Sequence, residues 1–177
     1  YATYFEGAQF VHFLLGPATV ALAVPLFRQT ETLKRALPVI VLGVLFGSLM
    51  ASASTVVLAW ALGASPETLA SLAPKSVTTP VAMGIAENIG GVPALTAVCV
   101  IATGIVGATL GPMVMNMARL KDWRARGFAM GVASHGIGTA RAFQVNETAG
   151  AFSGLAMGLN TMATALTIPF LWHWIFG

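Results

Sequence analysis

Two cations and two acids stand apart from the other charges of this sequence. Seven of its nine lysines and arginines fall in two short clusters, and the other two are Lys75 and Arg141. Each lies in a segment with one glutamate, Glu87 or Glu147. A guanidinium binds a carboxylate through two parallel hydrogen bonds, whereas an ammonium acts as a point charge. These residue types predict a site for a small carboxylate, with Arg141 as its main ligand and deepest cation.

Hydroxyl and imidazole groups lie close to the two cations in the sequence. We expect these groups to complete the substrate site: Ser76, Thr78, Thr79, Ser134, His135 and Thr139. Pro80, Gly136 and Gly138 should break the helices there, and helix starts that meet inside a membrane protein favour anions. Glu87 and Glu147 are candidates for carrying protons coupled to transport.

Each of these residues also has a purely structural interpretation. Lys75 could extend to the membrane surface, and Arg141 could form an ion pair with Glu147 or Glu87. His135 could be a packed, hydrogen-bonded side chain, and the two glutamates could cap their segments near the surface. The single cysteine excludes a cysteine-based metal site. With no convincing catalytic group either, we expect no enzyme, metal or cofactor.

The composition decides the class of protein. The chain has 177 residues, of which 56% are hydrophobic and only 8% are charged. A soluble domain of this size carries about 25% charged residues. The sequence therefore predicts an all-α integral membrane protein surrounded by the lipid bilayer. The net charge of +3 does not indicate nucleic-acid binding, because basic residues of membrane proteins usually mark cytoplasmic loops.

Four apolar segments are long enough to cross a bilayer. They run over residues 8–27, 37–62, 92–118 and 150–173. Two segments of intermediate polarity remain, 73–90 and 128–149. Before the first of these, Ser65, Pro66 and Glu67 form a helix-start signal, which predicts a short interfacial helix over residues 63–72.

The two basic clusters predict the topology. They lie at residues 28–35 and 119–126, and the positive-inside rule places both in the cytoplasm. Each intermediate segment must then cross the membrane an even number of times. We expect re-entrant or broken helices near the midplane, or for 73–90 alternatively a segment along the outer surface.

The two intermediate segments also resemble each other. An offset of 60 residues aligns 73–90 with 133–150 and gives five identities, among them Thr79 with Thr139 and Glu87 with Glu147. Chance similarity in a chain rich in alanine and glycine is the alternative. One span separates the copies, which predicts an inverted-topology repeat over 73–112 and 133–172, an architecture typical of secondary transporters. We expect Thr79 and Thr139 to approach each other at mid-depth.

Long blocks of the sequence resemble the LrgB family, which includes CidB, YohK and the plastidal glycolate/glycerate translocator. The most specific blocks are PKSVTTPVAM (residues 74–83) and ASHGIGTARA (residues 133–142). The resemblance implies a single LrgB-like transmembrane domain over 1–177 that lacks upstream spans, in a multi-pass protein of the bacterial inner membrane.

The same resemblance implies two functions. One is a secondary transporter for small monocarboxylates of the glycolate, glycerate or pyruvate type. The alternative is an antiholin-like protein that regulates murein hydrolase activity and autolysis with a small LrgA/CidA-type membrane partner. The repeat and the isolated cations favour the transporter, and we expect a homo-oligomer in either case.

Overall fold

Helices make up all the secondary structure that the computed structural model describes, which covers residue 27 and residues 30–176. Three of them are long and apolar enough to cross a membrane: α2 (Thr30–Ala61), α5 (Pro93–Met117) and α7 (Glu147–Phe176). They confirm the predicted spans 37–62, 92–118 and 150–173. The predicted span 8–27 lies outside the described residues except for Phe27. The described chain is therefore an all-α protein with three candidate membrane spans.

The long helices leave much of their apolar surface uncovered. Phe46 of α2, Val98 of α5 and Leu166 of α7 are 70%, 64% and 75% exposed. In water such surface would be unfavourable, whereas hydrocarbon chains can cover it. The exposed faces thus agree with the membrane class that the composition predicts.

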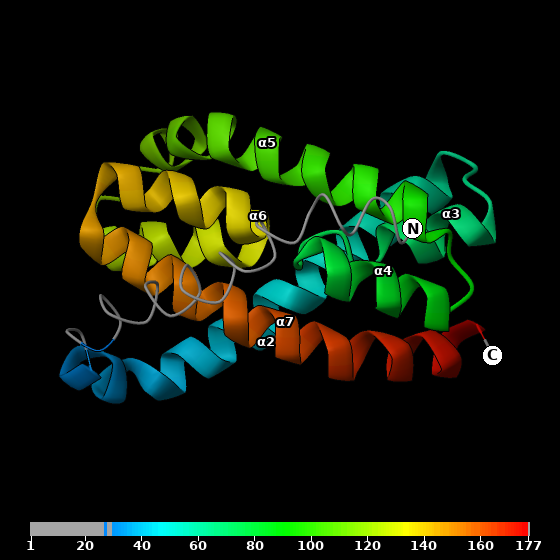
Figure 1. Ribbon diagram of the computed structural model, residues 1–177, viewed down its shortest axis with the longest axis horizontal. Coiled ribbons are helices and arrows are strands. Elements are labelled where there is room, and N and C mark those ends of the chain that lie inside the picture. The colour runs from blue at the N-terminus through cyan, green and yellow to red at the C-terminus, as the bar shows by residue number, and fades with distance from the viewer. Residues whose placement is uncertain (1–26, 28–29, 177) are drawn as a thin grey trace, which may run out of the picture.

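The chain between α3 and α5 makes a short excursion that starts and ends at the same place. Helix α3 (Pro66–Leu72) begins as predicted, with the Ser65 side chain accepting a hydrogen bond from Thr68 N. The chain continues through α4 (Thr79–Asn88) and returns to the end of α3, where Val92 N donates to Ser71 Oγ at 2.8 Å. Figure 1 shows α4 running outward from the middle of the bundle. Residues 72–91 therefore start and finish beside Ser71.

Helix α6 (Trp123–Val145) is a hairpin of two helical arms. The arms meet at His135, which has a non-helical backbone with φ 41° and ψ −133°. A Cβ on Gly131 in the first arm would meet the backbone oxygen of Ser153 in α7, and one on Gly138 in the second arm would meet Ser134. The first arm therefore lies along α7, and the second arm folds back over the first (Figure 1).

The helix breaks differ from the predicted ones. Pro80 is the second residue of α4 and does not break a helix, because a helix start tolerates the missing N–H of proline. Gly136 and Gly138 lie in the second arm of α6, after the break at His135. Glycine serves there for close packing, since a side chain at 138 would collide with the first arm.

The predicted offset of 60 residues pairs residues that occupy different positions within their helices. Thr79 is the first residue of α4, whereas Thr139 lies four residues beyond the break in α6. Glu87 is next to last in α4, whereas Glu147 is the first residue of α7. The inverted repeat therefore stays a prediction.

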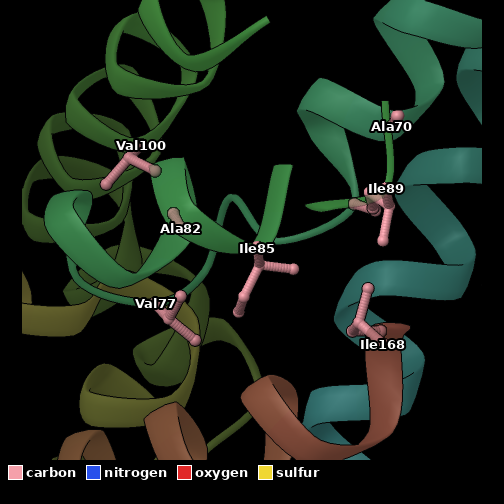
Figure 2. Close-up of a cluster of buried hydrophobic side chains, with 8 residues drawn as sticks. Ala70, Val77, Ala82, Ile85, Ile89, Val100 and Ile168 are labelled. Carbon is pink, nitrogen blue, oxygen red and sulfur yellow. The ribbon is translucent and has the colours of Figure 1, made fainter. Parts of the chain in front are cut away.

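A small apolar core fixes the connection between α3 and α4 inside the bundle. Figure 2 shows this cluster of side chains from α3, α4, α5, α7 and the connection itself, with Val77 among them. Val77 and Val100 are fully buried. Because Val77 is anchored in this way, the neighbouring Lys75 and Ser76 are drawn into the protein.

Candidate functional site

Asn160 of α7 joins the α3–α4 connection to the α6 hairpin, which are the two broken segments of this chain. Its side chain is 1% exposed, and Nδ2 donates to Ser76 O and to Val132 O, both at 3.2 Å. One carbonyl belongs to the α3–α4 connection and the other to the first arm of α6. Within the described chain, Oδ1 of Asn160 is buried without a hydrogen-bond partner. Buried polar atoms are rarely left unpaired, so this acceptor marks a candidate functional position.

His135 is held on several sides at the turn of the α6 hairpin. Its Nε2 lies 2.9 Å from Val100 O of α5, and since a carbonyl only accepts, Nε2 carries a proton. Thr139 Oγ1 donates to His135 O at 2.8 Å and pairs with Ser153 Oγ of α7 at 2.9 Å. The predicted site residues His135 and Thr139 are therefore both buried and adjacent.

Lys75 is a half-buried cation in the same region. Its Nζ donates to Ser76 Oγ at 3.3 Å, and Cys99 and His135 lie within electrostatic reach of its charge. The ion pairs among the described residues are Lys34–Glu31 and Arg124–Asp122, so no described carboxylate neutralises Lys75. A cation in the interior without a carboxylate attracts an anion.

Arg141 lies elsewhere. Its side chain is exposed, and Nη1 donates to Gln144 Oε1 at 3.3 Å. It lines a separate cavity with Trp123 and Arg126 at the end of the bundle where α6 begins. The expectation that Arg141 is the deepest cation is therefore wrong, because Lys75 is less exposed. A role of Arg141 in substrate binding stays a prediction.

The hydroxyl residues of the predicted site lie in or near the broken segments. Ser76 and Ser134 are buried, and Ser134 packs against Gly107 of α5. Thr78 and Thr79 are half-buried at the start of α4, where Thr78 is the N-cap residue but its side chain makes no capping bond. These hydroxyls can donate to a bound anion.

The two glutamates are exposed at helix ends. Glu87 is next to last in α4, and Glu147 begins α7. A negative charge in the first turn of a helix is favourable, which gives Glu147 a structural role. The position of Glu147 therefore favours capping over proton transport, whereas Glu87 lies at the end of a helix, where a carboxylate does not cap.

Sequence reasoning missed Asn160 and Ser153. The available signal was a polar side chain inside the apolar segment 150–173, since amides in membrane spans usually have a partner or a function. The single cysteine, Cys99 of α5, lies within electrostatic reach of Lys75.

The start of the α6 hairpin is fixed by Asp122. Its Oδ1 accepts from Arg124 N at 2.8 Å, and its Oδ2 accepts from Arg124 Nη2 at 2.6 Å. These bonds lower the pKa of Asp122 to about 2, with the side-chain bond from Arg124 as the largest cause. The pKa of Arg124 is raised by the same pair. The carboxylate thus caps the first turn of the first arm.

The chain is similar in sequence to several known proteins. The chain is 41% identical to the protein YwbG of Bacillus subtilis, over 97% of the chain and 76% of the relative. It is 32% identical to the holin-like protein CidB of Staphylococcus epidermidis, over 97% and 75% of the two chains. It is also 32% identical to the antiholin-like protein LrgB of Bacillus mycoides, over 94% and 72%.

No solved structure matches the chain. The LrgB-like family matches residues 1–174, nearly the full length. The resemblance seen in the sequence is thereby confirmed, and the chain belongs to the LrgB-like family.

Proposed function

We propose that this membrane protein is a secondary carrier for small monocarboxylates of the glycolate, glycerate or pyruvate type. The observation that carries the proposal is the half-buried Lys75, which no described carboxylate neutralises and whose charge is within electrostatic reach of His135. Two broken segments meet there and are tied together by Asn160. The proposed location is the bacterial inner membrane.

The shape of the chain supports a carrier. Residues 72–91 leave and return beside Ser71, and the α6 hairpin begins and ends near the start of α7. Segments that return to the side they came from are re-entrant if the long helices span the bilayer. In secondary transporters such segments line the substrate site near the midplane. We include the inverted repeat over 73–112 and 133–172 in the proposal.

The proposed site binds the carboxylate through Lys75. Hydroxyls of Ser76, Thr78 and Thr79 are next to it in the chain, and the start of α4 adds a positive dipole end. His135 contributes a ring at the α6 turn. Arg141 is left out of this site, because it lines a cavity whose lining includes none of the other predicted site residues.

A second candidate is favoured by the names of the relatives, and more directly than the carrier. Relatives are called antiholin-like LrgB and holin-like CidB. On this proposal the protein regulates murein hydrolase activity and autolysis with an LrgA/CidA-type partner. The exposed apolar faces of α2, α5 and α7 offer contact area for such a partner or for a second copy of the chain.

Flux measurements in proteoliposomes separate the two functions. We would measure uptake of labelled glycolate, glycerate and pyruvate, with and without an LrgA/CidA-type partner, for the wild type, Lys75→Gln and Lys75→Arg. Lys121→Gln, in the exposed basic cluster, is the matched control. For a carrier, flux should be saturable, and Lys75→Gln should weaken the apparent affinity for the substrate about ten- to a hundredfold, which is the value of one charge-assisted contact. Lys75→Arg should restore part of that affinity. Flux without saturation or selectivity, and unchanged in Lys75→Gln, would contradict the carrier and support the second function.

A further inference from the structure

A cavity of about 180 Å³ lies at the end of the bundle where the α6 hairpin begins. The end of α5, both arms of α6 and the start of α7 line it. Its walls are mostly apolar, with Met115, Met130 and Val145 among them, and two guanidinium groups, Arg126 and Arg141, belong to the same lining. The hollow thus combines an apolar interior with positive charge.

Arg126 is held in place by neutral groups. Its Nη1 donates to Asn116 Oδ1 at 2.8 Å and to Leu120 O at 2.9 Å, and its guanidinium lies 5.1 Å from the centre of the Trp123 ring. None of these partners carries a negative charge. The guanidinium is therefore preorganised while its full charge stays available for an anion.

Arg141 is likewise bonded to a neutral group, the amide oxygen of Gln144. Asp122, the acid in the nearby cluster, is occupied by Arg124. The ion pairs of the described chain include neither Arg126 nor Arg141. Two cations at one cavity, neither paired with an acid among the described residues, indicate a site for a phosphate or carboxylate group.

The position of the cavity indicates which kind of anionic ligand it binds. Its lining includes Trp123 and Arg126, both in the basic cluster 119–126, which the positive-inside rule assigns to the cytoplasmic membrane surface. Basic pockets between membrane helices on this side bind anionic lipid headgroups. A small free anion would satisfy the arginines but leave the apolar walls in contact with water.

We propose that this cavity binds an anionic phospholipid of the cytoplasmic leaflet. The phosphate lies between Arg126 and Arg141, and the beginning of an acyl chain covers Met115, Met130 and Val145. The proposal needs only that the protein is in a membrane, so it stands or falls independently of the carrier function.

Binding to the purified full-length protein tests the proposal. We would titrate phosphatidylglycerol, phosphatidylcholine and glycerol phosphate into detergent-solubilised protein, and measure bound molecules by native mass spectrometry and the shift in melting temperature. We expect phosphatidylglycerol to bind at least about tenfold more tightly than the other two, because only it has both the net charge and the chains.

Three variants locate the site. Arg141→Gln, on an exposed side chain, and Arg126→Gln should each weaken phosphatidylglycerol binding about tenfold or more. Lys121→Gln, with the same charge change outside the cavity, should bind as the wild type. Equal binding of phosphatidylcholine, equal binding of glycerol phosphate, or unchanged binding in Arg141→Gln would each overturn the lipid site. If Arg126→Gln does not fold, Arg141→Gln alone decides.

Discussion

Asn160→Leu should separate the two broken segments without opening a cavity. Leucine has about the same shape as asparagine but donates no hydrogen bond. The substitution removes the bonds from Nδ2 to Ser76 O and to Val132 O. In an unbroken helix Val132 O would accept from the N–H of residue 136, but the break at His135 falls between them. Asn160 therefore supplies a donor to each of these two carbonyls.

The expected loss of stability follows from these two bonds. Interhelical hydrogen bonds in membrane proteins contribute on average about 0.6 kcal/mol, and typical protein hydrogen bonds up to about 1.5 kcal/mol. Two bonds give about 1–3 kcal/mol. Leucine also removes the buried Oδ1 that has no partner in the described chain, and this gain favours the lower end of the range. At about 2–4 °C per kcal/mol, the melting temperature should fall by several degrees.

Thermal unfolding in detergent measures this difference, and hydrogen exchange shows where it acts. Protection should fall first in residues 72–78 and at the turn of α6. The matched control is Thr161→Val, the next residue of α7, whose hydroxyl bonds only to Met157 O of its own helix at 2.8 Å. If Asn160→Leu melts together with Thr161→Val and exchanges like the wild type, then Asn160 does not join the two segments.

Three further comparisons test the α6 hairpin by thermal unfolding in detergent. Gly131→Ala should lower the melting temperature because its methyl meets the backbone oxygen of Ser153, whereas Gly158→Ala, with nothing within 4 Å, should raise stability by about 0.5–1 kcal/mol. His135→Gly should be more stable than His135→Ala by about 1–3 kcal/mol, since both lose the imidazole but only glycine readily accepts φ 41°. Wild type should exceed Asp122→Asn in stability at neutral pH. That advantage should fade as the pH falls from the ordinary pKa of 3.8 through about 2, because the native carboxylate becomes protonated.

Each of these comparisons has a contrary result. Equal melting of Gly131→Ala and Gly158→Ala would mean that the first arm of α6 is not packed against α7. Equal stability of the two His135 variants would show that residue 135 does not need its unusual backbone. An advantage of the wild type over Asp122→Asn that persists at the lowest pH would rule out an ionised Asp122 as its source.

The long helices could be predicted because one physical rule governs them. Hydrocarbon demands continuous apolar segments with internally bonded backbones, and residues 92–118 became Pro93–Met117 almost without change. The start of α3 at Ser65 and Pro66 was equally local, since a cap and a proline need no distant partner. Continuous apolar length therefore predicts the positions of the spans, and capping predicts the start of one short helix.

The break in α6 was beyond local rules. Glycine content pointed to Gly136 and Gly138, but the turn is at His135. A positive φ at a non-glycine residue is unfavourable by itself. It is accepted here because Val100 O binds the ring and Thr139 binds the carbonyl of His135. Those contacts involve a residue of α5, which no short window of sequence contains.

The depth of the two cations shows why distance along a chain misleads in this fold. Arg141 was expected to lie deep because it is far from the basic cluster in sequence, yet the hairpin turns at His135 and carries it back to the cavity beside Trp123 and Arg126. Lys75 could have extended to the membrane surface because it is near the start of its segment. The buried Val77 instead holds the α3–α4 connection inside the protein. A substrate site built on helices that double back is thus set by where the chain turns. In this protein Asn160 and His135 hold the turns, and they therefore decide which of the two cations lies at the proposed substrate site.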